Sequence, residues 1–179
     1  MIKHFTSLTK VKRSENIMNV LMELVENKVL IFSGLSWVIA QIIKIIIALV
    51  TEKRFRPDRI FGDGGMPSGH SATVTSLAVL VGWTTGYNSV YFAIAMILAI
   101  IVMNDASGVR LEAGKHAASI KELADLVNEL FVEKDKEIKT EKLKLLVGHT
   151  PLQVFCGALL GIIVSICCIL IFKLPHPVF

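Results

Sequence analysis

Two long apolar runs, residues 29–50 and 150–172, constrain the fold of this chain more than any other feature. At 1.5 Å per residue, a helix of about 20 residues crosses a hydrocarbon core about 30 Å thick. A bilayer offers no hydrogen-bond partners to the backbone, so such runs must be helical. The hydrophobic fraction of 53% exceeds what a soluble chain of 179 residues needs for its core. We therefore expect an integral membrane protein.

Two shorter apolar blocks, residues 70–86 and 88–104, are separated by an uncharged turn around Tyr87 and predict a helical hairpin. The expected fold is an all-α, integral membrane helical bundle with four clear transmembrane helices. A polar loop follows over residues 105–148, with an amphipathic helix pattern at 117–131. The membrane domain would cover residues 29–173, with spans at 29–50, 70–86, 88–104 and 150–172.

The N-terminal segment, residues 1–28, is basic at its start and then carries apolar residues at roughly helical spacing. This pattern predicts an amphipathic helix lying in the membrane interface. A targeting peptide is the alternative interpretation, but a clean apolar core and a small-residue cleavage site are missing.

The sequence contains none of the patterns that mark zinc sites, P-loops, dinucleotide-binding folds or nucleic-acid-binding modules. Its three cysteines, Cys156, Cys167 and Cys168, all lie in the last apolar run, where packing is the expected role. We expect no metal, no cofactor and no nucleic-acid partner.

The stretch Gly64-Gly65-Met66-Pro67-Ser68-Gly69-His70 leads directly into the second apolar block. Ser68 and Gly69 would offer backbone N–H groups at a helix start, where the helix dipole favours an anion. His70 suits proton transfer near neutral pH. The basic run 53–59 precedes the stretch, so it predicts a phosphate site at the membrane surface. The alternative is a Gly/Pro turn with an incidental histidine.

A second histidine, His149, lies at the start of the fourth predicted span. Two spans separate it from His70, so both imidazoles would lie at the same membrane face. Taken alone, His149 would more often be a histidine facing water, and Lys44 could simply extend its ammonium to the interface. The same face would receive the charged residues Lys44, Arg54, Arg56, Asp105 and Arg110.

Two histidines beside a cationic cluster suit phosphoryl transfer. One imidazole attacks phosphorus, the other protonates the leaving oxygen, and lysine or arginine neutralises the remaining oxygens. This chemistry requires no metal ion, because the cations supply the charge stabilisation.

These residues resemble the type 2 phosphatidic acid phosphatase superfamily, which includes the vanadium haloperoxidases. Residues 67–70, Pro-Ser-Gly-His, match its second motif, and Gly-His-Thr-Pro at 148–151 resembles the third. Residues 29–172 as a whole are similar to the divergent branch of that superfamily. Its further hallmarks are Gln41 with Lys44 in the first span and Asp-Ala-x-Gly-Val-Arg at 105–110.

The resemblance implies that His149 forms a phosphohistidine and that His70 acts as the general acid. The sequence departs from the superfamily pattern at three positions. Leu49 stands where the first motif has its lysine, Leu143 where the third has its arginine, and Gln153 where an aspartate orients the nucleophile. Asp105 is then the candidate for the missing carboxylate. The phosphate-binding residues implied are Lys44, Arg54, Arg56, Ser68, Gly69 and Arg110.

The resulting hypothesis is a metal-independent membrane phosphatase that hydrolyses a lipid phosphomonoester or diphosphate. Phosphatidic acid, phosphatidylglycerophosphate and polyprenyl phosphates all fit. The alternative is a non-catalytic lipid-phosphate binder or carrier on the same frame, and a haloperoxidase-like vanadate site suits so apolar a chain poorly.

The loops 51–70 and 104–148 carry 4 and 8 Lys/Arg residues, and the turn near Tyr87 carries none. Counting basic residues alone therefore predicts a cell-membrane protein with its site at the cytoplasmic face. A homodimer could form through the small face of the last span, made of Gly157, Ala158 and Gly161.

Overall fold

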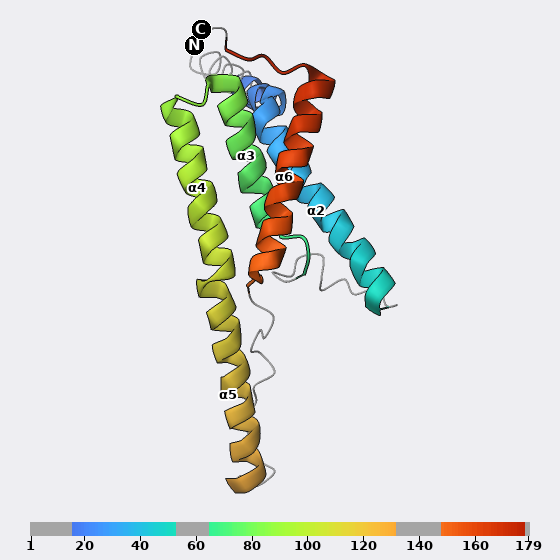
Figure 1. The fold of residues 1–179 in the computed structure, drawn as a ribbon, viewed down its shortest axis with the longest axis vertical. Helices are drawn as coiled ribbons and strands as arrows, with labels where there is room; N and C mark the ends of the chain where they lie inside the picture. Colours follow the sequence, from blue (N-terminus) through green and yellow to red (C-terminus); the bar gives the residue numbers. More distant parts are fainter. Residues whose placement is uncertain (1–15, 53–64, 132–147, 178–179) are drawn as a thin grey trace, which may run out of the picture.

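The computed structural model describes residues 16–52, 65–131 and 148–177. All regular structure in these ranges is helical, which confirms the predicted all-α membrane bundle (Figure 1). A helix covers residues 16–26. It is followed by α2 (Lys28–Glu52), α3 (Gly69–Thr85), α4 (Val90–Ser107), α5 (Val109–Phe131) and α6 (Pro151–Phe172).

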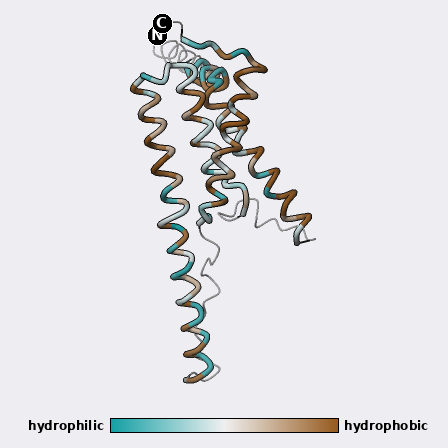
Figure 2. Tube along the Cα trace, viewed as in Figure 1, coloured by the Kyte–Doolittle hydropathy of each residue, from teal (hydrophilic) through white to brown (hydrophobic). Residues whose placement is uncertain are grey.

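Three helical stretches in the described ranges are long and apolar enough to cross a membrane: Lys28–Thr51, Val90–Leu130 and Pro151–Phe172. The remaining candidate, α3, has only 17 residues. The predicted count of four transmembrane helices is therefore not confirmed and stays a prediction. Tube colouring by hydropathy shows α4 and α6 as predominantly apolar and α5 as mixed (Figure 2).

Helix α3 is the centre of the bundle, because it packs against α2, α4 and α6. Small side chains let neighbouring helix backbones approach closely, which compensates for the weak hydrophobic drive inside a membrane. The buried residues of α3 are Gly69, Ser71, Ala72, Ser76, Ala78, Leu80 and Gly82.

The contact between α3 and α6 is especially close. A Cβ atom added at Gly157 would lie 2.4 Å from the Ser68 carbonyl oxygen, and one added at Gly161 would lie 2.4 Å from that of Ala72. One turn further on, the buried hydroxyls of Ser165 and Ser76 are hydrogen-bonded at 2.8 Å. The glycines that the sequence offered as a dimer interface therefore pack within the chain instead.

The hairpin between α3 and α4 has the predicted uncharged turn. Gly86 ends α3 with φ +91°, a backbone conformation that favours glycine. Ser89 then caps α4 by accepting the Phe92 N–H at 3.1 Å. The chain thus returns to the end of the bundle at which α3 begins (Figure 1).

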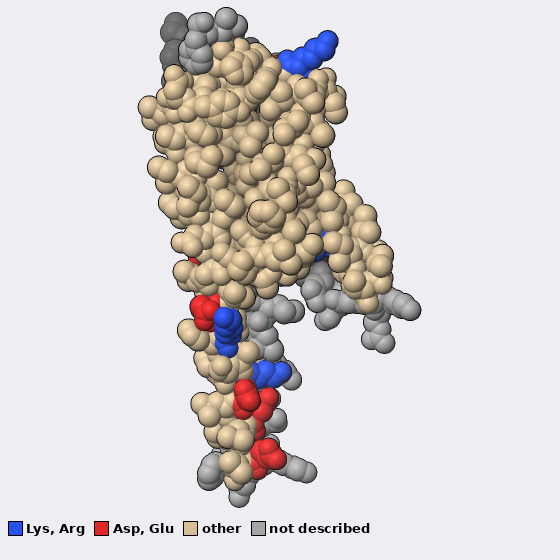
Figure 3. All heavy atoms as spheres, in the orientation of Figure 1, with Lys and Arg blue, Asp and Glu red and all other residues tan. Residues whose placement is uncertain are grey.

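The predicted polar loop is largely helical in its described part. Helix α4 continues to Ser107 and α5 begins at Val109, eight residues before the predicted helix at 117–131. Helix α5 extends beyond the bundle along the direction of α4, and charged side chains gather on it (Figures 1 and 3). Among them, Lys115 lowers the pKa of the exposed Glu112 carboxyl, first by its hydrogen bond and then by its charge.

Candidate functional site

The predicted site residues that the structure describes gather at one end of the bundle, where α3 and α6 begin and α4 passes into α5 (Figure 1). Four separate sequence segments contribute to this end, and each meets another through a defined contact.

Lys44 of α2 meets the loop that precedes α3. A Cβ atom added at Gly65 would lie 3.2 Å from Lys44 Cγ and 3.3 Å from Lys44 Cδ, so the lysine stem crosses directly over this glycine. Gly65 also has φ +95°, a backbone conformation that is strained for any residue with a side chain. Lys44 is only 5% exposed despite its charge. The predicted approach of Lys44 to the Gly-Gly-Met-Pro-Ser-Gly-His stretch is thus present.

Ser68 is the N-cap of α3, and its hydroxyl accepts the Ser71 N–H at 3.4 Å. The Ser68 N–H, expected to face an anion, instead donates to the Gln153 carbonyl oxygen at 3.0 Å. Gly69 and His70 therefore carry the first N–H groups of α3 that lack an intrahelical acceptor. The N–H groups at the start of α3 that could face an anion therefore begin one residue later than predicted.

Gly69 is enclosed by α2. A Cβ atom at this position would lie 3.0 Å from the Trp37 ring and 4.0 Å from Gln41 Nε2. Gln41 Oε1 is buried and accepts no hydrogen bond from the residues that the structure describes. The sequence signalled Gln41 through its pairing with Lys44, whereas Trp37 was missed, although it lies one helical turn before Gln41 on the same face.

The backbone around His149 is anchored to the junction of α4 and α5. The His149 N–H donates to the Ala106 carbonyl oxygen at 2.9 Å. Gly148, with φ +91°, approaches the backbone of Leu111 so closely that a Cβ atom would lie 2.4 Å from its nitrogen. The motifs at 105–110 and 148–151 therefore meet through their backbones.

The side chain of His149 is 2% exposed, and its Nδ1 lies 3.2 Å from Gln153 Oε1. The same oxygen accepts the Thr150 N–H at 3.1 Å. A backbone N–H can only donate, so the Gln153 atom at this point must be the oxygen, and His149 Nδ1 must carry the proton. When the ring is neutral, this assignment leaves on Nε2 the lone pair that a nucleophile needs.

His70 and His149 come together as the topology predicted. Their ring centroids lie 6.3 Å apart, with the ring planes inclined by 61°. His149 is buried and His70 is exposed, so one imidazole is fixed in the protein and the other faces the surroundings.

Asp105 and Arg110 form a half-exposed ion pair across the α4–α5 junction. Arg110 Nε donates to Asp105 Oδ2 at 2.7 Å, and the two side chains are 43% and 40% exposed. Gly108 between them ends α4 by donating its N–H to the Asn104 carbonyl oxygen. The carboxylate predicted to support the nucleophile thus binds the arginine predicted to bind phosphate.

Two predicted phosphate ligands, Arg54 and Arg56, lie outside the described residues, as does Leu143. Within the ranges that the structure describes, no group of three or more His, Cys, Asp or Glu residues could hold a metal ion.

One positional signal in the sequence was missed. Residues 150–153, Thr-Pro-Leu-Gln, have the spacing of a capping box, in which the N-cap and N3 residues satisfy each other's backbone N–H groups. Both halves are present here, since Gln153 N also donates to Thr150 Oγ1 at 3.4 Å. This pattern fixes the Gln153 amide, and with it the ring of His149.

Comparison with known proteins identifies the family of the chain. The model of the family described as "Divergent PAP2 family" matches residues 25–164. The uncharacterized membrane protein YuiD of Bacillus subtilis (strain 168) is 39% identical over 151 residues, which cover 81% of this chain and 96% of that protein. No solved structure matches the chain. The family match includes all four segments that meet at this end of the bundle, and the chain belongs to the divergent PAP2 family.

Proposed function

We propose that this protein is a membrane phosphatase that hydrolyses a lipid phosphate through a phosphohistidine at His149. The observation that carries the proposal is the orientation of His149 by Gln153, whose Oε1 accepts a hydrogen bond from Nδ1–H and so directs Nε2 to act as the nucleophile. Family membership supports a phosphatase-related chemistry.

In the first step, His149 Nε2 forms a bond to phosphorus while the bond from phosphorus to the lipid oxygen breaks. His70 donates its proton to that leaving oxygen. The two ring centroids lie 6.3 Å apart, which is close enough for both imidazoles to contact one phosphate group. In the second step, His70 takes a proton from water, which attacks phosphorus and releases His149.

The negative charge that develops on the phosphoryl oxygens would be stabilised by Lys44, Arg110 and the backbone N–H groups of Gly69 and His70. Asp105 has the role of holding the guanidinium of Arg110 in position through its 2.7 Å hydrogen bond. We call Lys44, Arg110 and these two N–H groups the phosphate cradle. Ser68 positions the N–H groups as the N-cap of α3. Arg54 and Arg56 remain further candidates from the preceding basic run.

The proposed substrate is a lipid, because the site lies where apolar helices begin, which we expect to be the depth of lipid headgroups. We also propose that this end of the bundle faces the cytoplasm, since the loops 51–70 and 104–148 carry 4 and 8 Lys/Arg residues.

The test is phosphate release by the purified full chain in detergent, measured over phosphatidic acid, phosphatidylglycerophosphate and polyprenyl phosphates. His149→Ala and His70→Ala should each abolish turnover, and a phosphoryl adduct should map to His149 by mass spectrometry. His116→Ala, an exposed histidine on α5, is the matched control and should behave like the parent. Turnover that survives in His149→Ala would refute the mechanism.

A non-catalytic lipid-phosphate binder is the second candidate. The observation that favours it is the neutral partner of His149, because Gln153 orients the ring but cannot stabilise an imidazolium as a carboxylate does. A parent protein that binds the lipid phosphates above but releases no phosphate from any of them would identify this candidate as correct.

A further inference from the structure

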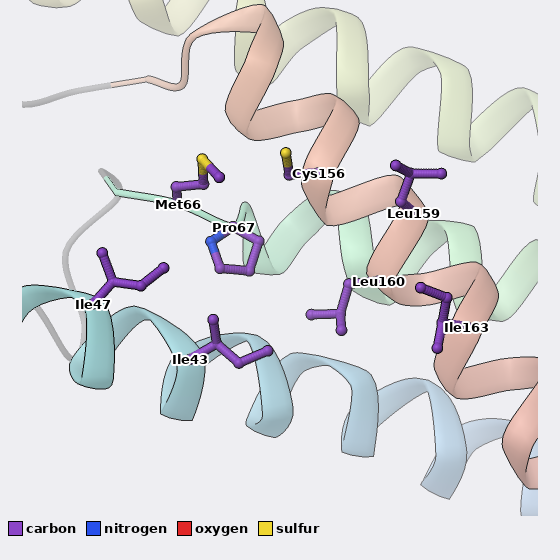
Figure 4. Close-up of a pocket in the computed structure, with 8 residues that line it drawn as sticks. All are labelled: Ile43, Ile47, Met66, Pro67, Cys156, Leu159, Leu160 and Ile163. Carbon is purple, nitrogen blue, oxygen red and sulfur yellow. The ribbon is translucent and has the colours of Figure 1, made fainter.

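An apolar groove of about 280 Å³ lies beside the phosphate cradle, between α2 and α6 (Figure 4). Toward its C-terminal end α2 leans away from α6 (Figure 1), and Met66 and Pro67 of the loop before α3 line the groove (Figure 4). None of the groove's lining residues in the described part of the chain is charged. It is lined by Ile43, Ile47, Met66, Pro67, Cys156, Leu159, Leu160 and Ile163.

The groove and the cradle share structural parts. Pro67 lines the groove and immediately precedes Ser68, the N-cap of the cradle helix. Lys44, whose stem crosses Gly65, follows Ile43 of the groove wall directly on α2. An amphiphile with its anionic group beside Lys44 would therefore have its apolar part at the mouth of the groove.

The direction of the groove also fits an amphiphile. Its α6 wall runs from Cys156 to Ile163, which is about 8 to 18 Å along the helix axis from the first residue of α6. The charged cradle lies at the start of α6, and the apolar groove extends from there along the apolar part of the helix. A membrane lipid has the same order of polar and apolar parts along the bilayer normal.

We propose that this groove holds a hydrocarbon chain of the lipid phosphate while its phosphate occupies the cradle. The inference rests on the proposed function for the identity of the headgroup. The small volume suits one chain and not a whole lipid. Ile163 and Leu159 are 57% and 43% exposed, so the groove opens sideways and a chain can enter from the bilayer.

The test is photo-cross-linking of the purified full chain, in lipid nanodiscs, with a phosphatidic acid that carries a diazirine in one acyl chain. Label should map to Ile43, Leu160 and Ile163, and excess unlabelled phosphatidic acid should abolish it. A diacylglycerol with the same diazirine chain is the matched probe, because it differs only in lacking the phosphate. It should label these residues no more than the exposed outer face of α4 around Ile94 and Ile97.

Equal labelling of the groove by both probes would mean that bulk lipid fills it, which overturns the proposal even if the protein is a phosphatase. Groove labelling by phosphatidic acid without phosphate release would leave this inference standing while the proposed catalysis fails. An Ile163→Cys variant that oxidises to a disulfide-linked dimer, where the parent does not, would assign the groove to a second copy and also overturn it.

A variant pair gives a readout without a photoprobe. Ile163→Trp fills the far end of the groove, whereas Leu170→Trp changes an exposed position on the same helix outside it. Exclusion of about two methylenes should raise the KM or Kd for long-chain phosphatidic acid about tenfold in Ile163→Trp. The effect should shrink as the acyl chain is shortened. An equal change in Leu170→Trp, or a change independent of chain length, would contradict the groove.

Discussion

His149 and Gln153 are joined by a hydrogen bond of 3.2 Å between Nδ1 and Oε1, and the same oxygen accepts the Thr150 N–H at 3.1 Å. One amide oxygen thus completes a capping box and fixes a histidine tautomer. The partner lies four residues after the histidine, one turn further along the chain at the start of α6. Local helix geometry therefore brings the Gln153 amide to His149 at the position where the superfamily pattern has a carboxylate.

Replacement of Gln153 tests this arrangement. Gln153→Leu should lower kcat about 100-fold, because His149 loses the acceptor that holds its proton on Nδ1. Gln153→Glu should keep most activity and move the acid limb of the rate–pH profile to higher pH, since a carboxylate favours the imidazolium and Nε2 is then protonated at higher pH. Steady-state kinetics across pH provide the measurement.

Thr150→Ala is the control for Gln153→Leu. It removes the Thr150 hydroxyl that caps α6 but leaves the Thr150 N–H and the His149 contact of Gln153 in place. It should lower the free energy of unfolding by about 1 kcal/mol and leave kcat close to that of the parent. A large loss of kcat in Thr150→Ala would show that Gln153 acts through helix capping and not through the histidine.

Loss of the ion pair between Asp105 and Arg110 should lower kcat/KM and change the free energy of unfolding little. Both side chains are about 40% exposed, so breaking the pair should cost less than about 1 kcal/mol of folding free energy. Asp105→Asn should nevertheless lower kcat/KM for a lipid phosphate about tenfold, because Arg110 loses a charge-assisted hydrogen bond that orients it. Glu112→Gln breaks the exposed pair with Lys115 and should change neither quantity.

Gly157 should be indispensable for packing. Its Cβ position lies 2.4 Å from the Ser68 carbonyl oxygen, so Gly157→Ala must separate α6 from the start of α3. We expect a loss of about 1 to 3 kcal/mol in unfolding free energy, with a lower Tm in detergent and reduced turnover. Gly34→Ala is the matched control, because nothing lies within 4 Å of its Cβ position on α2. It should keep or raise the Tm, since alanine favours a helix over glycine.

Helix positions could be predicted closely from the apolar blocks. The predicted spans at 29–50 and 70–86 correspond to α2 (Lys28–Glu52) and α3 (Gly69–Thr85). The end of α4 was harder to predict from the sequence, because hydropathy falls at Asn104 while the helix continues to Ser107. A change in polarity marks where a helix leaves the apolar layer, not where its backbone hydrogen bonds stop.

The position of His70 and His149 at the same end of the bundle could be predicted, since it depends only on the number of helices between them. Their hydrogen-bond partners could not, because these depend on distances between helices. The Ser68 N–H reaches the Gln153 carbonyl oxygen only because Gly157 lets α6 approach α3. Asp105 was a reasonable candidate partner for His149, but Gln153 is nearer along the chain and lies on the first turn of α6.

The proposed orientation of the site can be tested with single cysteines. Asn88 lies in the turn between α3 and α4, and Ser119 is exposed on α5, beyond the opposite end of α4. In a chain whose three native cysteines are replaced by serine or alanine, Asn88→Cys should react with a membrane-impermeant maleimide in intact cells. Ser119→Cys should react only after the cells are opened, because the basic loops favour the cytoplasm. The reverse labelling pattern would place the phosphate cradle at the outer face, where it could act only on lipid phosphates of the outer leaflet.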